Sequence, residues 1–326
     1  MKEFIINENE AGQRFDKYLG KLLREAPKSF FYKMLRKKNI TLNGGKATGN
    51  EKLSAGDTVK LFLSDETFEK FSGNEEKVAR AYQALDILYE DENILLINKP
   101  AGMLSQPADN KEASLVEYLT GYLLENGSIT EASLHTFRPS VCNRLDRNTS
   151  GIVAAGKTLA GLQELSTLFH DRTLHKFYRC LVKGVIKNEK YIRGYLHKDE
   201  KCNKVTIQEK ETPGALPIET RYYPLGNNGS LTLLEVELIT GRTHQIRAHL
   251  SSIGHPLVGD YKYGARSIND EYQKKYGLKS QLLHAYRLEI PRIEGRISYL
   301  SDRSFRAPLP QLFQNILKEE HVEENK

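Results

Sequence analysis

The sequence predicts an α+β protein made of a small basic α/β module and a larger domain with a mixed, mostly antiparallel sheet. Three observations favour this. The 326 residues suggest about two domains on a scale of roughly 150 residues each. Positive charge is concentrated near the N-terminus. Farther along the chain, short apolar runs alternate with amphipathic stretches, and some of these runs are joined by tight turns.

The module is predicted to span residues 1–63. Apolar residues recur at helical spacing over 15–23 and 30–35, and Pro27 and Ser29 are suited to the start of the second helix. Two short strands joined by Gly-rich turns follow, up to residue 63. Residues 14–38 carry nine basic residues against two acids, a local charge of +7 in a chain of total charge +6.

Such a basic unit indicates nucleic-acid binding, although a solvated helix face is the alternative for any single basic helix. The residues expected to contact a phosphate backbone are Arg14, Lys17, Lys33, Arg36, Lys37 and Lys38.

The larger domain is predicted to span residues 85–317, after a polar linker at 64–84 and before a disordered tail at 318–326. It opens with two apolar runs around the acidic turn EDEN, typical of a hairpin. Further strands are expected at 152–155, 178–186 and 231–239, and helices at 113–124, 158–170 and 243–253.

Composition excludes several classes of protein. Hydrophobic residues make up 39% of the chain and charged residues 28%, and no run approaches the roughly 20 apolar residues of a membrane span. The N-terminus does not look like a signal peptide, so a cytoplasmic protein without a membrane partner is expected. Cys142, Cys180 and Cys202 lack the spacing of a metal site or redox pair, and we expect ordinary reduced thiols.

Residues 144–158, RLDRNTSGIVAAGKT, permit two interpretations. The last eight match the pattern of a phosphate-binding loop. However, such a loop follows a buried strand, whereas here polar residues precede Gly151 and residues 152–155 favour a strand themselves. We therefore expect Gly151 to close a loop and Thr158 to cap a helix. The other interpretation is a site built around Asp146, between two arginines. A carboxylate near cations is held ionised, which suits a nucleophile.

The first eight of these residues resemble the RLD-x-x-TSG signature of pseudouridine synthases of the RluA type, in particular its RluC and RluD branch for large-subunit ribosomal RNA. The resemblance continues through LYEDENILLINKPAGM (88–103), HKFYRCLVKG (175–184), TGRTHQIRAHLSSIGHPLVGDYKYG (240–264), LLHAYRL (282–288) and FRAPLP (305–310). The N-terminal module resembles the S-four-like RNA-binding module found in that family, at Arg14, Phe15, Asp16, Lys17, Ser29, Arg36, Asn43, Gly56, Asp57 and Val59. Where the signature usually begins with histidine, this chain has Asn143.

The resemblance implies isomerisation of uridine in RNA to pseudouridine, without cofactor or metal. Asp146 would be the nucleophile, attacking the base or ribose C1′, or assisting through a glycal. Tyr178 would stack on the uracil and is a candidate for proton removal, and Arg247 would keep Asp146 ionised and oriented. The target nucleotide must be flipped out of folded RNA, and Arg144 would fill the vacated stack.

Three further residues are candidates for RNA contacts. Lys176 lies on the same side of its predicted strand as Tyr178, and could support the tyrosine, bind a phosphate or be solvated. Arg242 and Lys262 are expected to contact phosphates. His244 shares a helix face with Arg247, and we expect it to be an ordinary hydrogen-bonding histidine.

Large-subunit (23S) ribosomal RNA, bound by a monomer, is the expected partner, because a separate basic module favours it. A transfer RNA substrate and a non-catalytic, ribosome-associated RNA-binding factor are the alternatives.

Overall fold

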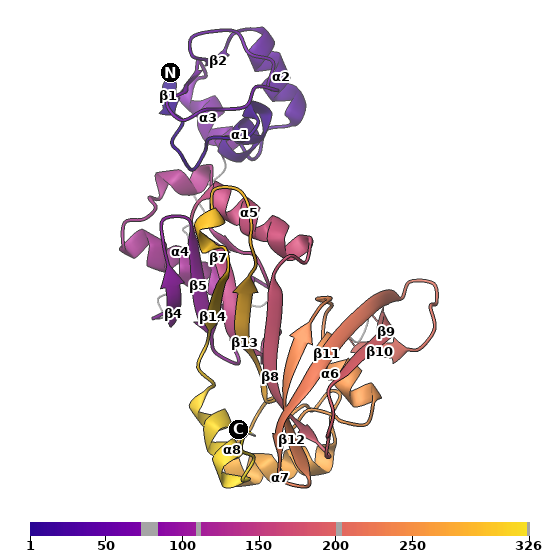
Figure 1. Cartoon of the computed structure of the whole chain (residues 1–326). Helices are drawn as coiled ribbons and strands as arrows, with labels where there is room; N and C mark the ends of the chain where they lie inside the picture. The colour runs from indigo at the N-terminus through magenta and orange to yellow at the C-terminus, as the bar shows by residue number, and fades with distance from the viewer. Residues whose placement is uncertain (73–83, 109–111, 200–203, 325–326) are drawn as a thin grey trace.

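The computed structural model describes residues 1–72, 84–108, 112–199 and 204–324. A small N-terminal module lies at one end of a larger body, and the two termini lie at opposite ends of the molecule (Figure 1). The body contains a large, mostly antiparallel sheet with helices beside it, so the predicted α+β class is confirmed. Among the described residues, no helix is both long and apolar enough to cross a membrane.

The N-terminal module packs its helices against a sheet of order β1-β3-β2. Its elements are β1 (Lys2–Ile5), α1 (Phe15–Leu22), α2 (Lys28–Arg36), β2 (Ile40–Leu42), β3 (Thr58–Leu61) and α3 (Asp65–Ser72). The apolar residues at helical spacing in α1 and α2 form its core, with Phe15, Leu19 and Leu35 at most 1% exposed. Strand β1 was not predicted, because its short apolar stretch is surrounded by polar residues. Ser29 lies inside α2, and Pro27 is the residue before the helix.

The linker prediction is wrong for residues 65–72. They form α3, whose Phe68 stacks on Phe4 at 6.1 Å between ring centroids and whose Phe71 lies 4.5 Å from Phe30. These two aromatic residues are three apart and therefore share one face of the helix, which docks on the module core. The module extends at least to Ser72. The remainder of the predicted linker, 73–83, lies outside the described residues.

The module contacts the body beside the short helix η1 (Ala132–His135). The Arg24 Nη2 donates to the Leu134 carbonyl oxygen at 3.2 Å. The Thr136 hydroxyl donates to the carboxylate of Glu10, which is only 6% exposed. A buried carboxylate requires such a partner, so this contact helps to hold the module against the body.

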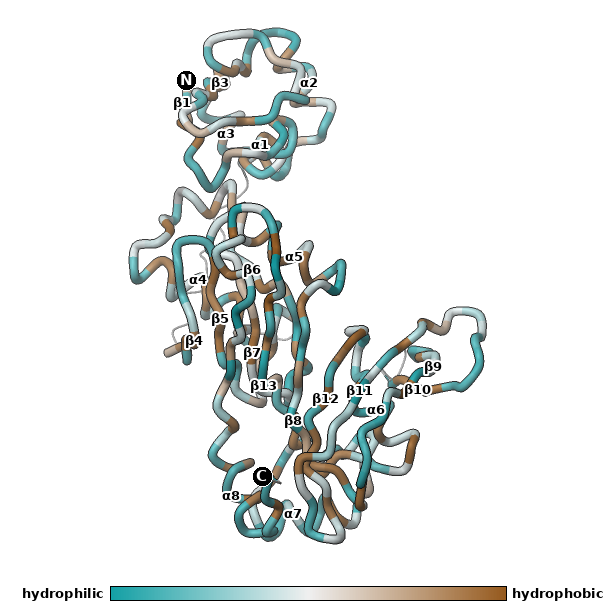
Figure 2. The backbone as a smooth tube through the Cα atoms, viewed as in Figure 1, coloured by the Kyte–Doolittle hydropathy of each residue, from teal (hydrophilic) through white to brown (hydrophobic). Residues whose placement is uncertain are grey.

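The sheet of the body has 11 strands in the part of the chain described, with main order β10-β9-β11-β12-β8-β13-β7-β5-β4. Its strands are β4 (Ile87–Glu90), β5 (Ile94–Lys99), β6 (Ser140–Val141), β7 (Ser150–Gly156), β8 (His175–Lys183), β9 (Lys190–Asp199), β10 (Lys204–Gln208), β11 (Leu216–Asn227), β12 (Leu231–Leu238), β13 (Leu283–Ile290) and β14 (Arg303–Arg306). Hydrophobic residues concentrate along β5 and β12, whereas much of β9 and β10 is hydrophilic (Figure 2). This is why the sequence predicted β5 and β12 but not β9 and β10.

The helices of the body agree with the sequence prediction where apolar periodicity is strong. They are α4 (Leu115–Glu125), α5 (Leu159–His170), α6 (Gln245–Ser252), α7 (Arg266–Tyr276), α8 (Gln311–Glu319) and the short η2 (Ser298–Leu300). Helices α4, α5 and α6 lie within a few residues of their predicted ranges. Helix α7 was not predicted, because it is rich in polar residues.

The residues of the apparent phosphate-loop sequence take part in the fold: the predicted helix cap at Thr158 is confirmed, whereas Gly151 lies inside β7 and does not close a loop. Every residue of β7 is buried, and Gly151, at φ 111°, has no room for a side chain because a Cβ would lie 2.3 Å from the Ala285 carbonyl oxygen. Lys157 Nζ pairs with Glu90 Oε1 at 2.6 Å. Thr158 Oγ1 accepts a hydrogen bond from the Gly161 amide and caps α5. The lysine and threonine are therefore already engaged by the protein.

The prediction of a disordered tail is wrong for residues 318–324. Helix α8 continues to Glu319, and Val322 is buried. Glu320 Oε1 accepts hydrogen bonds from Tyr276 Oη at 2.5 Å and Lys275 Nζ at 2.8 Å. A Cβ at Gly226 would collide with the Glu323 carbonyl oxygen, so the tail runs directly over β11. The sequence did not predict this packing, because the segment is made mostly of charged residues. Residues 325–326 lie outside the described residues.

Candidate active site

Asp146 lies in the loop that leads into β7, and this loop is held on both sides of the aspartate. The Thr149 amide donates to the Asp146 carbonyl oxygen at 2.9 Å, closing a turn. Ser105 Oγ donates to the Leu145 carbonyl oxygen at 2.8 Å and accepts from the Leu145 amide at 3.1 Å. On the other side, the Gly102 amide donates to the Arg147 carbonyl oxygen at 2.9 Å. The Asp146 backbone is therefore well anchored.

A fully buried lysine adds to this anchoring. Lys99 Nζ donates to the carbonyl oxygens of Pro100 at 2.9 Å, Met103 at 2.8 Å and Arg147 at 3.1 Å. Burial lowers the pKa of Lys99 to about 8, although the negative charge of Asp146 acts in the opposite direction. Lys99 was not among the predicted site residues. A lysine that ends an apolar strand just before a proline was the available signal.

The structure brings Arg247 and Asp146 together. Arg247 Nη1 donates to Asp146 Oδ2 at 2.9 Å from the third position of α6. The Arg247 side chain is 9% exposed and that of Asp146 is 26% exposed, so the carboxylate is the more accessible member of the pair. An arginine held in this position fixes the direction of the carboxylate through a charge-assisted hydrogen bond.

A second carboxylate, which sequence reasoning missed, holds the far side of this arginine. Asp260 Oδ2 accepts from Arg247 Nε at 2.7 Å and Oδ1 accepts from Nη2 at 2.9 Å, and the Asp260 side chain is fully buried. Burial acts to raise the pKa of Asp260, but hydrogen bonds and charge from Arg247 outweigh it, and the pKa is lowered. The amides of Lys262 and Tyr263 also donate to Oδ1. Asp260 thus orients Arg247 toward Asp146.

His244 lies next to the same carboxylate, with Nε2 3.8 Å from Asp146 Oδ2. Its Nδ1 lies 2.8 Å from Tyr263 Oη, which already accepts a hydrogen bond from the Val205 amide. When the Tyr263 hydroxyl donates to Nδ1, the proton of the neutral imidazole lies on Nε2, on the Asp146 side. Burial lowers the pKa of His244, which favours this neutral form. His244 is thus a hydrogen-bonding histidine beside Asp146.

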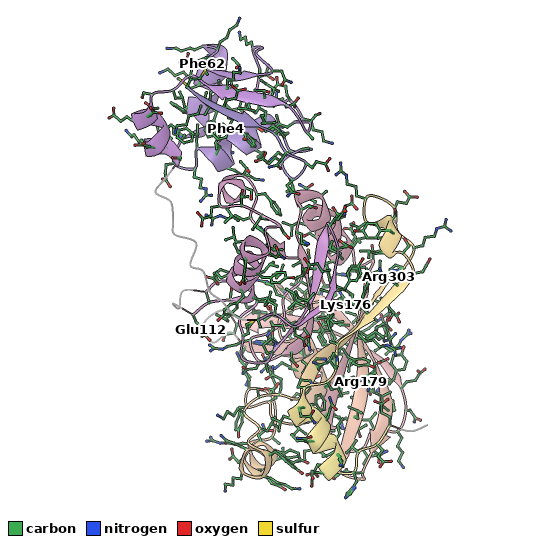
Figure 3. The ribbon with its side chains drawn as sticks, turned by 90° about the vertical axis from the view of Figure 1, so that its left-hand side faces the viewer. Phe4, Phe62, Glu112, Lys176, Arg179 and Arg303 are labelled. Atoms are coloured by element: carbon green, nitrogen blue, oxygen red, sulfur yellow. The ribbon has the colours of Figure 1, made fainter. Side chains whose placement is uncertain are left out.

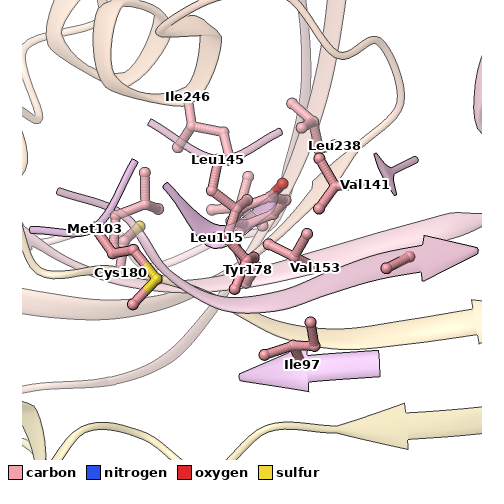
Figure 4. Packing of buried hydrophobic residues seen from close by; sticks show 14 of the residues in the cluster. Ile97, Met103, Leu115, Val141, Leu145, Val153, Tyr178, Cys180, Leu238 and Ile246 are labelled. Carbon is pink, nitrogen blue, oxygen red and sulfur yellow. The ribbon is translucent and has the colours of Figure 1, made fainter. Parts of the chain in front are cut away.

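Tyr178 lies on β8 in the largest apolar cluster of the body. It is 7% exposed, and Figure 4 shows its ring close to Leu145, Val141 and Leu238. Leu145 directly precedes Asp146, so the ring packs against the loop that carries the aspartate. Burial raises the pKa of Tyr178, and the negative charge of Asp146 adds to this effect. The phenol is therefore protonated at neutral pH.

Comparison with known proteins defines the family. The model of the RNA pseudouridylate synthase family matches residues 93–252. The ribosomal large subunit pseudouridine synthase C of Vibrio vulnificus is 33% identical over 288 residues, which cover 86% of this chain and 85% of that protein. An uncharacterized RNA pseudouridine synthase of Mycoplasma genitalium is 32% identical over 300 residues, which cover 90% of each chain. The chain belongs to the RNA pseudouridine synthase family.

This synthase also shares its fold with a solved relative, Human RNA Pseudouridylate Synthase Domain Containing 4. The TM-score is 0.58 at 23% identity, over 74% of this chain and 94% of that chain. As a member of its family, the synthase is an isomerase. No group of three or more His, Cys, Asp or Glu side chains that could hold a metal ion is found within the described ranges.

Asn143, the synthase's departure from the usual signature, extends the pairing of β6 with β7. Its Nδ2 donates to the Ile152 carbonyl oxygen at 3.2 Å, and its Oδ1 accepts from the Ala154 amide at 2.8 Å. The side-chain amide thereby supplies one donor and one acceptor where the backbone ladder ends. Asn143 therefore helps to fix the start of the Asp146 loop.

The residues predicted to bind RNA lie in different environments. Arg144 is exposed, two residues before Asp146, whereas Lys176, Arg242 and Lys262 are half-buried in the body. All six basic residues named in the module are exposed. Of these, Arg14 is already engaged, because its Nη2 lies 2.8 Å from Asp16 Oδ2 and 2.7 Å from Asn50 Oδ1. The structure does not bring the module residues to Asp146, because they lie on or beside α1 and α2 of the N-terminal module.

His284 on β13 links Ser150, which follows the Asp146 loop, to Ala307, which follows β14. Its Nε2 lies 3.3 Å from the Ala307 carbonyl oxygen, which can only accept, so Nδ1 accepts from Ser150 Oγ at 2.8 Å. The imidazole is neutral near pH 7, because its pKa lies well below this pH. Burial lowers its pKa to about 4, and burial does the same for His249.

We expect acid to destabilise the synthase through these two histidines. Unfolded histidine titrates near pH 6.5, so between pH 6.5 and 4 the unfolded state binds more protons than the folded state. The free energy of unfolding then falls as the pH falls, by up to about 3 kcal/mol for each histidine. Urea unfolding across this window measures the slope. His284→Gln should reduce it and the exposed control His170→Gln should not; equal slopes for the two variants would contradict the assignment.

Proposed function

We propose that this synthase isomerises uridine to pseudouridine in large-subunit (23S) ribosomal RNA. Two observations support the substrate. Its similarity to ribosomal large subunit pseudouridine synthases extends over most of both chains. It also carries an exposed basic surface on a module separate from the active site, as expected for an enzyme that recognises a large RNA. We further propose that it acts as a monomer in the cytoplasm.

The carboxylate of Asp146 is the proposed nucleophile. The observation that carries this assignment is a series of hydrogen bonds from Asp260 through Arg247 to Asp146. Asp260 and Arg247 are buried, whereas Asp146 is accessible. A nucleophile must be directed and reachable, and this arrangement supplies both requirements. Attack on uracil, attack on ribose C1′ and assistance through a glycal are all compatible with one accessible carboxylate.

Tyr178 and Arg144 are proposed to receive the flipped nucleotide. The Tyr178 ring is rigidly packed beside the Asp146 loop and offers a surface on which uracil can stack. Because burial raises its pKa, stacking is better supported than proton removal in the free protein. Arg144 is exposed on the same loop, and its planar guanidinium can occupy the space that the base leaves in the RNA.

Mapping pseudouridines in total RNA from cells that lack the gene tests the substrate. The proposal expects loss of one or more pseudouridines from 23S ribosomal RNA, restored by the wild-type gene and not by Asp146→Ala. Loss from transfer RNA alone would favour the alternative substrate. An unchanged map would favour the non-catalytic RNA-binding factor.

The basic surface of the module should contribute to the salt dependence of RNA binding. Arg36 and Lys37 are exposed at the end of α2. Replacing both with glutamine should reduce the slope of log K against log salt by up to about 1.4–1.8, because each lost phosphate contact removes about 0.7–0.9. Filter binding to transcribed 23S ribosomal RNA measures the slope. The matched control is Lys274→Gln with Lys279→Gln, at the opposite end of the molecule; an equal effect there would refute a specific role for the module.

A further inference from the structure

Lys176 is a half-buried ammonium group on the active-site face of β8. It precedes Tyr178 by two residues, so both side chains are on one face of the strand, and both line a small pocket with Asn143. Figure 3 shows Lys176 within the body, level with the central strands. Burial lowers the pKa of Lys176, and the positive charge of Arg172, in the turn before β8, lowers it further. No ion pair between Lys176 and a carboxylate is found among the described residues.

The loop between β12 and α6 lies directly over this lysine. A Cβ built on Gly241 would be 3.9 Å from Lys176 Nζ. The next residue, Arg242, has a buried Nε without a hydrogen-bond partner in the part of the chain described. The loop itself is held in place, because Gln245 Oε1 accepts from the Arg242 amide at 3.1 Å and from Thr240 Oγ1 at 2.9 Å. This fixed loop therefore carries Arg242, with its unpaired Nε, directly after the glycine that lies over Lys176.

We propose that Lys176, Arg242 and Arg172 bind a backbone phosphate of the RNA next to the flipped uridine. The inference deepens the proposed function and rests on it. A buried ammonium group beside other cations is unfavourable until an anion arrives, and a phosphate accepts the hydrogen bonds that these side chains have available. Two residues along a strand span about 7 Å, which places the phosphate close to the nucleotide that stacks on Tyr178. The absence of a side chain at Gly241 leaves space for it.

Lys176→Met tests this site in the full-length enzyme. We expect its KM for transcribed 23S ribosomal RNA, measured by tritium release from 5-tritiated uridine, to rise about tenfold while kcat changes little, because the contact is made equally before and during reaction. The salt slope of binding should fall by about 0.7–0.9. Lys176→Arg should restore most of the affinity. Thermal unfolding should show Lys176→Met at least as stable as wild type, since an unpaired buried charge has been removed.

The control is Lys183→Met, which removes an exposed charge from the other end of β8. If Lys176→Met and Lys183→Met had the same KM and salt slope, the phosphate site would be refuted. Inactive wild-type enzyme would instead refute the proposed function, so the two failures are distinguishable.

A second pair of variants, at Gly241 in the loop between β12 and α6, tests the same site. An aspartate at position 241 would bring a carboxylate within reach of Lys176 Nζ and compete with the phosphate, whereas asparagine has the same shape without the charge. Gly241→Asp should therefore raise KM well above that of Gly241→Asn. In the Lys176→Met background this difference should shrink. An equal difference in both backgrounds would show that Lys176 does not hold the anion.

Discussion

Asp146→Asn is expected to abolish pseudouridine formation. The asparagine keeps the shape of the side chain and an oxygen that accepts from Arg247, so the loop should retain its structure, whereas the nucleophile is lost. Removal of a covalent nucleophile typically lowers kcat by at least about 10⁴-fold. Tritium release from 5-tritiated-uridine RNA measures this directly, because formation of the new bond at C5 displaces the tritium.

A measurement of RNA binding distinguishes a loss of catalysis from a loss of folded structure. Asp146→Asn should bind 23S ribosomal RNA at least as tightly as wild type, since one negative charge has been removed from a site that receives a polyanion. Asp270→Asn, a change of the same kind at an exposed position on α7, should leave tritium release unchanged. Tritium release by Asp146→Asn at the rate of wild type would rule out Asp146 as the nucleophile.

Asp260→Ala is expected to have the largest effect on stability. It leaves the Arg247 guanidinium buried with Asp146 alone, after the loss of two hydrogen bonds of 2.7 and 2.9 Å. Breaking a buried ion pair from one side costs about 3–5 kcal/mol in the free energy of unfolding. We also expect kcat to fall at least about tenfold, because a catalytic group displaced by about 1 Å loses much of its orientation. Urea denaturation and tritium release measure the two effects.

The exposed aspartate again supplies the control. Asp270 pairs with Arg266 at 3.8 Å on the surface of α7, and such pairs contribute at most about 1 kcal/mol. Asp270→Ala should therefore change stability little. Asp260→Asn keeps one oxygen that can accept from Arg247 but loses the charge. Its free energy of unfolding should therefore lie between those of wild type and Asp260→Ala. If Asp260→Ala were no less stable than Asp270→Ala, the buried pair would not support the site in the way that its geometry indicates.

Sequence patterns predicted the elements whose apolar residues repeat regularly. The stripe of Leu159, Leu162 and Leu165 predicted α5, and the near-alternation of residues 231–239 predicted β12. Helix α3 and the C-terminal tail were missed because each packs through few apolar side chains, Phe68 and Phe71 in one and Val322 in the other. In such segments the partner surface decides the structure, and that surface comes from distant parts of the chain.

The candidate site divides in the same way. The family motifs indicated Asp146, Tyr178 and Arg247, but Asp260 and Lys99 were not identified. Each of these two is a buried charged residue whose role depends on partners remote in sequence: Asp260 bonds Arg247, 13 residues away, and Lys99 bonds the Arg147 carbonyl, 48 residues away. Sequence alone shows that a charged residue is present, and its typical position is solvent.

By itself, the sequence determined the α+β class and the family, and it predicted the basic module and a site around Asp146, because these follow from local periodicity, charge and contiguous motifs. Only the tertiary structure decided how Asp146 is held, which groups surround Tyr178, and that the segments around 65–72 and 318–324 are packed. The physical reason is that burial, pKa and ion pairing depend on which groups surround a side chain, and folding brings those groups from far along the chain.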